Sequence, residues 1–181
     1  MSESDDEYGD LDVARIFNAL DTHDVTYVVV GGSAAILWGA ARATRDIDCV
    51  ALQSRDNFTS LCAALKSLGN PRLRIEGVDD ETAIELSSQL LHPDFFERTA
   101  ASTWRTDAGS IDILASIPDI NGDPVDYQQL SRRSSTASTG EVHVSVASLD
   151  DVIDSKTHAN RAKDREALPE LHDLRRRNTR N

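Results

Sequence analysis

The chain has 181 residues, of which 39% are hydrophobic, 28% are charged and only 5% are aromatic. This length suggests one domain, which can bury roughly two-thirds of the surface that its unfolded chain exposes, enough for a compact core without disulfides or a structural metal. The formal net charge of −12 argues against broad, nonspecific binding to a polyanion. From Lys156 onward, however, eight basic side chains stand against four acidic ones, so an anionic ligand could still bind there.

The sequence lacks the signals of several other protein classes. Its two cysteines, Cys49 and Cys62, are too few for a disulfide framework, and its five histidines form no i, i+4 pair, which argues against a zinc hydrolase. No stretch approaches the ~20 apolar residues needed to cross a bilayer, and the acidic start does not resemble a secretory leader. We therefore expect a soluble, cytoplasmic protein without a membrane partner.

The first part of the chain alternates between helical and strand patterns. Residues 1–10 are acidic, and we expect them to form a disordered tail ahead of a single domain over residues 11–181. Asp10 is placed to cap a helix with the apolar stripe Leu11, Ile16, Phe17 and Leu20. The β-branched and aromatic run Thr26–Val30 predicts a buried strand, and Ala34–Gly39 has helix-forming composition.

The next segments continue this alternation. Asp46–Ala51 predicts a strand with Asp46 and Asp48 on the same face, because side chains alternate along a strand. Ser54 is placed to open a helix that ends at Gly69. In the acidic middle of the chain we expect a helix over Asp80–Leu91.

The second half predicts a hairpin followed by helices. We expect strands over Thr99–Thr106 and Ser110–Leu114, and then a short helix, a short strand and two closing helices, over Asp123–Ser131, Val142–Val146, Leu149–Ala159 and Asp164–Arg177. This pattern predicts an α/β domain with a mixed sheet flanked by helices and a C-terminal helical segment from about residue 149.

The turn Gly31-Gly32-Ser33 lies between a predicted strand and a predicted helix. Glycines at such a corner let backbone N–H groups approach a phosphate, and the following helix N-terminus adds a favourable dipole. The Ser33 hydroxyl could donate to the same phosphate. The corner therefore indicates an anion site, although the two glycines could also serve only a tight turn.

Three acidic residues lie in predicted strands. Asp46 and Asp48 would hold their carboxylates close together, an arrangement that a hard cation such as Mg²⁺ stabilises. Asp112 lies within the apolar run Ile111–Leu114 and needs a partner. A phosphate-binding turn beside such carboxylates is suited to the transfer of a nucleotidyl group, in which metal ions orient the attacking hydroxyl and the triphosphate.

Several sequence blocks together carry a family resemblance. The segments GGS, RATRDID, GSIDIL and SLDDVIDSKTHANRAKD resemble the minimal nucleotidyltransferase superfamily, which has the DNA polymerase β-like fold. Within it they are similar to the group of AbiEii-type and MenT-type toxins and their single-domain relatives. The resemblance extends over about residues 27–171.

The resemblance implies roles for individual residues. Gly32 and Ser33 would hold the nucleotide phosphates together with the Gly31 backbone, and Asp46 and Asp48 would bind the metal. Asp112 would be the third carboxylate, as a metal ligand or as the base for the acceptor hydroxyl. The resemblance further implies that four C-terminal residues close over the nucleotide: Lys156, Arg161, Lys163 and Asp164. Lys156 would supply a point charge and Arg161 a planar fork, and Asp164 could orient either of them.

The family pattern is not matched at every position. Relatives often have glycine and proline where this chain has Asn160 and Ala162. Asparagine tolerates the left-handed conformation, so we expect the turn to be kept. Arg45 adds a cation next to Asp46 and is a candidate nucleotide-binding residue that could equally form an ion pair with an acid.

Structural interpretations exist for the same residues. Asp46 and Asp48 could lie on a solvated edge strand, and Asp112 could pair with Arg105 on the facing strand. Lys156 could be a solvated helix residue, and Asp164 could only cap the last helix. The strand, sharp turn and helix around Ser33 also invite a serine-hydrolase interpretation, in which the two neighbouring acids would have no role.

The sequence therefore predicts a Mg²⁺-dependent transferase that moves a nucleoside monophosphate from an NTP to an acceptor hydroxyl. By resemblance we favour the 3′ end of a tRNA as acceptor and a toxin–antitoxin or phage-defence role with a cognate antitoxin. A protein hydroxyl or a small molecule remains open as acceptor. A nucleotide-binding or interaction module without turnover is the alternative from another class.

Overall fold

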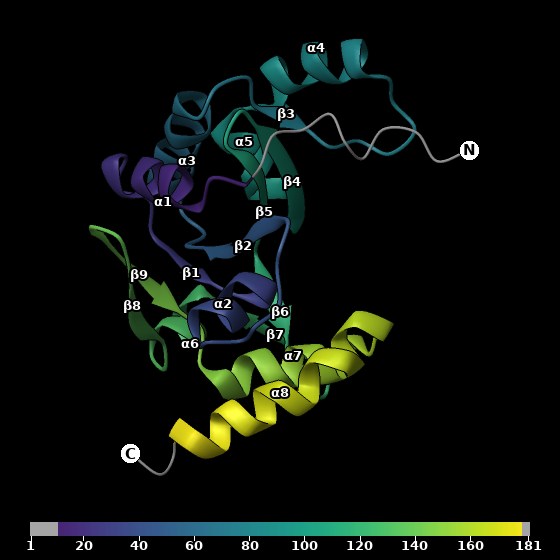
Figure 1. Cartoon of the computed structure of the whole chain (residues 1–181). Helices are drawn as coiled ribbons and strands as arrows, with labels where there is room; N and C mark the ends of the chain where they lie inside the picture. Colours follow the sequence, from purple (N-terminus) through teal and green to yellow (C-terminus); the bar gives the residue numbers. More distant parts are fainter. Residues whose placement is uncertain (1–10, 179–181) are drawn as a thin grey trace.

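The structure, a computed structural model, describes residues 11–178 (Figure 1). The expected disordered tail, residues 1–10, lies outside the described residues, as does Asp10 with its expected role as a helix cap. The elements follow one another in the order α1 (Val13–Thr22), β1 (Tyr27–Val29), α2 (Gly31–Leu37), β2 (Asp46–Ala51), α3 (Arg55–Ser67), β3 (Arg72–Leu73), α4 (Asp80–Leu90), α5 (Pro93–Arg98), β4 (Ala101–Thr106), β5 (Gly109–Leu114), β6 (Ser116–Pro118), β7 (Pro124–Asp126), α6 (Tyr127–Ser131), β8 (Ser135–Thr139), β9 (Val142–Val146), α7 (Leu149–Ala159) and α8 (Ala162–Asn178).

The strands form a mixed sheet, as the sequence predicts. Seven of them pair in the order β3-β4-β5-β2-β1-β9-β8, and β6 pairs with β7 in a separate ribbon. The β2–β5 and β1–β9 pairs are parallel, and the other pairs are antiparallel. The parallel β2–β5 pair lies at the centre of the sheet and carries the predicted acids.

The alternation of side chains divides the central sheet into an apolar and a polar face. Ile47, Ile111 and Trp104 are directly paired across β2, β5 and β4, so they project to one face, where each is at most 1% exposed. The ring of Phe96 in α5 packs 5.9 Å from that of Trp104, and the ring of Phe58 in α3 packs 5.7 Å from Phe96. This aromatic cluster fixes α3 and α5 on the apolar face, and the opposite face carries Asp46, Asp48 and Asp112.

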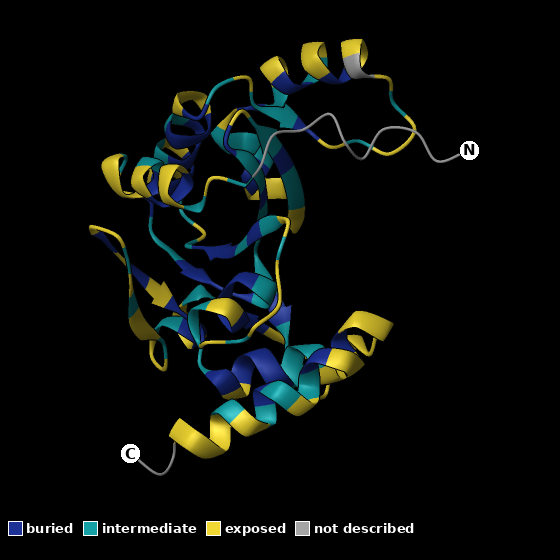
Figure 2. Cartoon of the chain, in the orientation of Figure 1, coloured by how far each residue is buried: buried dark blue, intermediate teal, exposed yellow. Residues whose placement is uncertain are grey.

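The C-terminal helices provide the other side of the functional site. Helix α2 lies beside β2, and α7 and α8 pack against each other next to α2 (Figure 1). The buried residues of α7 and α8 face this junction, while their outer surfaces are exposed (Figure 2). The last two helices therefore form a wall opposite the acidic strands.

Most of the predicted elements are present, with informative differences. β2, β9 and α7 have the predicted bounds, and Ser54 caps α3 as expected. The side chain of Asp12 caps α1, and the two glycines begin α2 instead of preceding it. Pro124–Asp126 is a strand and not the start of a helix, because it pairs with β6. The sequence gives no prediction of β3, α5, β6 and β8.

Among the helices of residues 11–178, none combines the length and the apolar character that crossing a membrane requires.

The turn between α7 and α8 depends on Asn160, which has φ 47° and ψ 28°, in the left-handed region expected for it. We predict that Asn160→Gly keeps or slightly raises the free energy of unfolding, whereas Asn160→Val lowers it by about 1–2 kcal/mol, because a β-branched residue is strained at positive φ. Urea denaturation of both variants measures this difference. Equal stability of the two variants would contradict it.

Candidate active site

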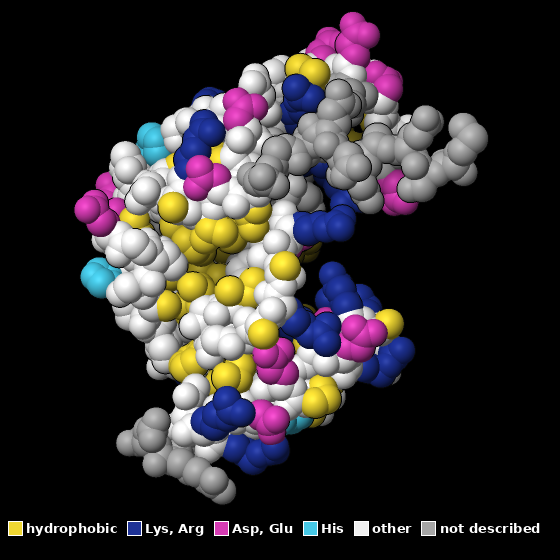
Figure 3. All heavy atoms as spheres, in the orientation of Figure 1, with side chains coloured by type: hydrophobic (Ala, Val, Ile, Leu, Met, Phe, Trp, Pro, Cys, Tyr) yellow, Lys and Arg dark blue, Asp and Glu magenta, His cyan; other side chains and the backbone are white. Residues whose placement is uncertain are grey.

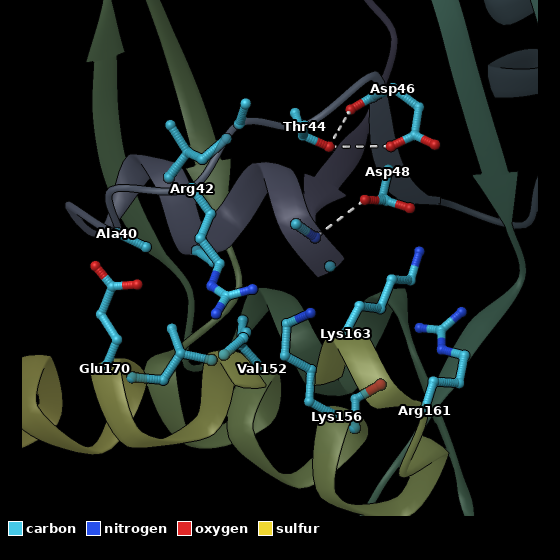
Figure 4. Close-up of a pocket in the computed structure, with 18 of the residues that line it drawn as sticks. Ala40, Arg42, Thr44, Asp46, Asp48, Val152, Lys156, Arg161, Lys163 and Glu170 are labelled. Atoms are coloured by element: carbon cyan, nitrogen blue, oxygen red, sulfur yellow. Dashed lines mark hydrogen bonds between the residues drawn. The ribbon is translucent and has the colours of Figure 1, made fainter. Parts of the chain in front are cut away.

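A cavity of about 250 Å³ lies between the polar face of β2 and β5, helix α2, and the wall that α7 and α8 form. Eight of the predicted site residues line it, namely Gly31, Gly32, Asp46, Asp48, Asp112, Lys156, Arg161 and Lys163. Figure 4 shows Asp46 and Asp48 on one side and Lys156, Lys163 and Arg161 on the other, pointing toward the space between them. One cavity thus divides into an acidic and a basic wall.

The three acids come together through strand register. Asp48 on β2 is paired directly with Asp112 on β5, and Asp46 is two residues before Asp48 on the same face. Burial, with added repulsion from Asp46 and Asp112, raises the pKa of Asp48 to about 6. The Gly32 N–H and the charge of Lys156 act in the opposite direction. The central position of β2 rules out the solvated edge-strand interpretation of these two acids.

Asp112 is partly buried and incompletely hydrogen-bonded. Burial raises its pKa above the ordinary value, although a hydrogen bond with Thr103 and the charges of Arg74 and Lys163 oppose the shift. Its Oδ1 atom is buried and makes no hydrogen bond with any residue that the structure describes. The register places Thr103, not Arg105, opposite Asp112. Such a buried oxygen needs a partner from outside the described chain.

The glycine corner lies directly against Asp48. Gly31 has φ 60°, and a Cβ atom placed on it would lie 2.5 Å from the Asp48 carboxylate. The backbone N–H of Gly32 donates to Asp48 Oδ2 at 3.1 Å. Only glycine fits at position 31, because any side chain would both strain the backbone and collide with the carboxylate. The corner therefore positions Asp48 as well as lining the cavity.

Ser33 has a different position from the one that its expected phosphate contact requires. Its side chain is buried, does not line the cavity, donates to the Asp46 carbonyl at 3.0 Å and accepts from the Asp48 N–H at 3.2 Å. The hydroxyl thus holds α2 against β2. This geometry also removes the basis for a serine nucleophile, because the oxygen is enclosed and bound to backbone.

The basic wall is organised by one buried acid. Asp164 is 0% exposed, and its carboxylate accepts hydrogen bonds from Lys156 Nζ at 3.2 Å and from Arg161 Nε at 2.6 Å. Burial alone would raise the pKa of Asp164, but the hydrogen bonds from Arg161 and Lys156 outweigh burial and hold the pKa below its ordinary value. Asp164 does not cap α8, which begins at Ala162, and it positions both cations instead of lining the cavity.

The remaining predicted cations differ in their placement. Lys163 lines the cavity and forms no ion pair with any described residue, so its charge is available to a ligand. Arg45 is exposed and is not among the residues that line the cavity. Its expected contact with the nucleotide therefore gains no support from its position.

Two contributors to the site were not predicted. The Thr44 hydroxyl donates to Asp46 Oδ1 at 3.0 Å and thereby orients that carboxylate. Arg42 lines the cavity and donates to the backbone carbonyl of Glu166 at 2.9 Å, which ties the segment before β2 to α8. Both residues lie within the RATRDID motif, but only the tertiary structure shows that Arg42 reaches the last helix.

The carboxylates fit a divalent cation as a partial ligand set. Their crowding and the unsatisfied Asp112 oxygen are both relieved by a cation, and hard oxygens are the ligands of Mg²⁺. Among the described residues, however, no three Asp, Glu, His or Cys side chains are arranged as a complete metal site. Mg²⁺ is usually held by one or two carboxylates together with substrate phosphates, so an incomplete protein ligand set is consistent with it.

Comparison with known proteins agrees with this geometry. The family model described as "Nucleotidyltransferase of unknown function (DUF6036)" matches residues 10–174. No curated protein matches the sequence. The match confirms the predicted nucleotidyltransferase superfamily, while the narrower resemblance to AbiEii-type and MenT-type toxins stays a prediction.

Two solved structures have a similar fold. One is a Thermotoga maritima protein (TM1012) provisionally described as a nucleotidyltransferase, with 15% identity, a TM-score of 0.52, and coverage of 89% of this chain and 90% of that one. The other is the lincosamide antibiotic adenylyltransferase LnuA with bound lincomycin, with 13% identity, a TM-score of 0.53, and coverage of 92% and 99%. At such low identity these likenesses show the fold alone, and they confirm the predicted fold class.

The raised pKa of Asp48 predicts a pH-dependent effect of Asp48→Asn. A pKa raised from 3.8 to about 6 means that ionisation destabilises the folded state, by up to about 3 kcal/mol once the pH exceeds the folded value. We expect Asp48→Asn to raise the free energy of unfolding by about 2–3 kcal/mol near pH 8 and by little near pH 4. Urea denaturation at both pH values measures the gain, with Glu141→Gln in an exposed turn as the control. The same gain at both pH values would contradict the assignment.

Asp164→Asn should destabilise the protein more than loss of a surface ion pair. Removing the buried carboxylate leaves Lys156, whose side chain is 13% exposed, without its partner, and we expect a loss of about 3 kcal/mol in the free energy of unfolding. Because the pKa of Asp164 is lowered, its contribution is present above its unfolded pKa and is lost as the pH falls.

Glu166→Gln is the matched control for Asp164→Asn, since it weakens the exposed Arg42–Glu166 pair and should cost at most about 1 kcal/mol. Denaturation of both variants near neutral pH makes the comparison. Equal losses would show that Asp164 contributes no more than a surface acid.

Proposed function

Because the chain belongs to this family of nucleotidyltransferases, we propose that it transfers a nucleoside monophosphate from an NTP to an acceptor hydroxyl and releases pyrophosphate. The acceptor oxygen forms a bond to the α-phosphorus while the bond from that phosphorus to the bridging oxygen breaks. The acceptor proton passes to a carboxylate, and pyrophosphate leaves with the bonding electrons. The family assignment supports the class of reaction, and the positions of individual residues support the roles that we propose for them.

The observation that supports the proposal most strongly is the pairing of an acidic wall with a basic wall in one cavity. Triphosphate oxygens would lie against Lys156, Arg161 and Lys163, which neutralise charge on the leaving pyrophosphate. Asp164 keeps the first two of these cations in place. The glycine corner would contribute backbone contacts to the phosphates, while Ser33 would act through its hold on β2.

Asp46 and Asp48 are the residues that we propose to hold Mg²⁺, with Asp112 beside them. When bound, the metal would offset the negative charge of the triphosphate and of the acceptor oxygen. Asp112 is the proposed proton acceptor for the hydroxyl, since burial raises its pKa and one of its oxygens has no hydrogen-bond partner among the described residues. Thr44 orients Asp46 for its part in this set.

The acceptor that we favour is the 3′ end of a tRNA, in a toxin–antitoxin or phage-defence setting with a cognate antitoxin. The support for this choice is the motif resemblance to toxins of that kind. A small-molecule acceptor is the second candidate, because the fold is also that of an adenylyltransferase whose structure holds lincomycin. Labelled NTPs incubated with total RNA, cell extract or small hydroxyl compounds would separate these acceptors by where the label appears.

Asp48→Ala is predicted to abolish transfer, with a loss of at least about a thousandfold in pyrophosphate release, because it removes a proposed metal ligand at the reacting phosphate. Pyrophosphate release from NTP in the presence of Mg²⁺ and cell extract measures the effect. Circular dichroism checks that the variant folds, and Glu141→Ala in an exposed turn is the control, with activity like the wild type. Turnover by Asp48→Ala like that of the wild type would refute the role of Asp48.

A further inference from the structure

A second, smaller cavity of about 180 Å³ lies between β3, β4 and the start of α4. Three arginines line it, Arg72, Arg74 and Arg105, and its other lining residues are all apolar. Although the whole chain carries a formal charge of −12, none of the described residues that line this cavity is acidic. We call it the arginine pocket.

The register of the sheet connects the arginine pocket to the acids. One row of directly paired residues crosses the sheet from Asp46 to Ser110, Arg105 and Arg72. Directly paired side chains project to the same face, so these arginines share a face with Asp46.

A second, parallel row begins at Asp48 and passes through Asp112 and Thr103. The Arg74 N–H donates to the Thr103 carbonyl at 2.8 Å, which continues the antiparallel register and places Arg74 at the end of this row. The polar face of the sheet therefore runs without interruption from the acids of the active site to the arginines.

The row also fixes an approximate separation. Neighbouring strands are about 4.8 Å apart, and two strand intervals separate β5 from β3. The backbone at Arg74 therefore lies about 10 Å from that at Asp112, on the side opposite to α7 and α8. A molecule that presents a hydroxyl to Asp112 could reach the arginine pocket with a group about that far away.

The charges of the arginine pocket suit a phosphate group. Arg72 and Arg74 form no ion pair with any residue that the structure describes, and Arg74 is exposed. Guanidinium groups are weakly hydrated and match phosphate oxygens with two parallel hydrogen bonds. Arg72 and Arg74, which line the same hollow, repel each other unless an anion lies between them. Figure 3 shows Lys and Arg side chains on both sides of the deep notch at the right of the molecule.

We propose that the arginine pocket binds a phosphate group of the acceptor, so that the molecule receiving the nucleotidyl group is itself phosphate-bearing. This inference rests on the proposed transferase function. The NTP would lie against the basic wall of α7 and α8, the acceptor phosphate would lie between β3 and β4, and Asp112 would stand between them. In a nucleic acid strand stacked as in a duplex, with about 3.4 Å per nucleotide, about 10 Å corresponds to roughly three nucleotides from a terminal hydroxyl.

The experiment measures binding of two probes, a fluorescent single-stranded RNA hexanucleotide and ribose 5-phosphate as its competitor. Wild-type protein, Arg72→Ala/Arg74→Ala and the control Arg98→Ala/Arg132→Ala are titrated at several salt concentrations. The control removes the same charge from exposed arginines outside both cavities. Calorimetry with NTP and Mg²⁺ checks that the pocket variant keeps its nucleotide site.

We expect the pocket variant, Arg72→Ala/Arg74→Ala, to lose RNA affinity by about tenfold or more. The slope of log affinity against log salt concentration should become shallower by about 0.7 for each lost phosphate contact. The control should bind like the wild type. RNA binding without competition from ribose 5-phosphate would identify a nucleic acid acceptor, and effective competition would identify a small phosphate ester. The proposal is overturned if neither probe binds the wild type, or if the pocket variant and the control lose affinity equally.

Pyrophosphate release by the same proteins separates this inference from the proposed function. Release by the wild type together with unchanged RNA binding by the pocket variant would refute only the arginine pocket. Absence of release with any RNA or extract, together with the expected loss of binding, would refute the transferase and with it the acceptor role, while the phosphate pocket itself would stand.

Discussion

Repulsion between carboxylates on one face of the sheet is the constraint on which the site depends. Asp48 and Asp112 are directly paired, and Asp46 is on the same face, so the fold holds like charges together in a partly buried place. The Gly32 N–H and the Lys156 charge only partly offset burial and this repulsion, so the pKa of Asp48 is raised to about 6. Ionisation of all three carboxylates is therefore electrostatically unfavourable here, and a divalent cation would relieve their repulsion.

The basic wall on the other side of the cavity holds positive charges close together. Lys156 and Arg161 would repel each other and adopt many rotamers if they were solvated, and the buried Asp164 restricts both. Asp164 can therefore affect a bound substrate through these two cations without touching the substrate itself. Lys163, three residues from the α7 to α8 turn at Asn160, stays outside this network and adds its charge to the cavity. One buried acid thus makes a basic wall from residues that a helix pattern alone would place in solvent.

Local periodicity in the sequence predicts where strands lie and which of their side chains share a face. It does not predict which strands pair with each other. Alternation placed Asp46 and Asp48 on one face correctly, and the strand bounds followed. The proximity of Asp112 depends on the parallel β2–β5 pairing, which no local pattern encodes, so it came from the family resemblance. The neighbouring glycines predict a phosphate contact for Ser33, whereas in the structure its hydroxyl is hydrogen-bonded to the backbone of β2. The two-residue strand β3 was too short for any periodic signal.

The same limit explains how an acidic protein could accommodate the two anionic substrates that we propose. The formal charge of −12 counts residues without their positions, and it argues only against binding over the whole surface. Sheet register gathers Arg72 and Arg105 at one end of the polar face, and helix packing gathers Lys156 and Lys163 at the other. Between them lie the acids that would otherwise repel both ligands. Since potentials fall off within a Debye length of about 10 Å, two local basic sites can act independently of the net charge.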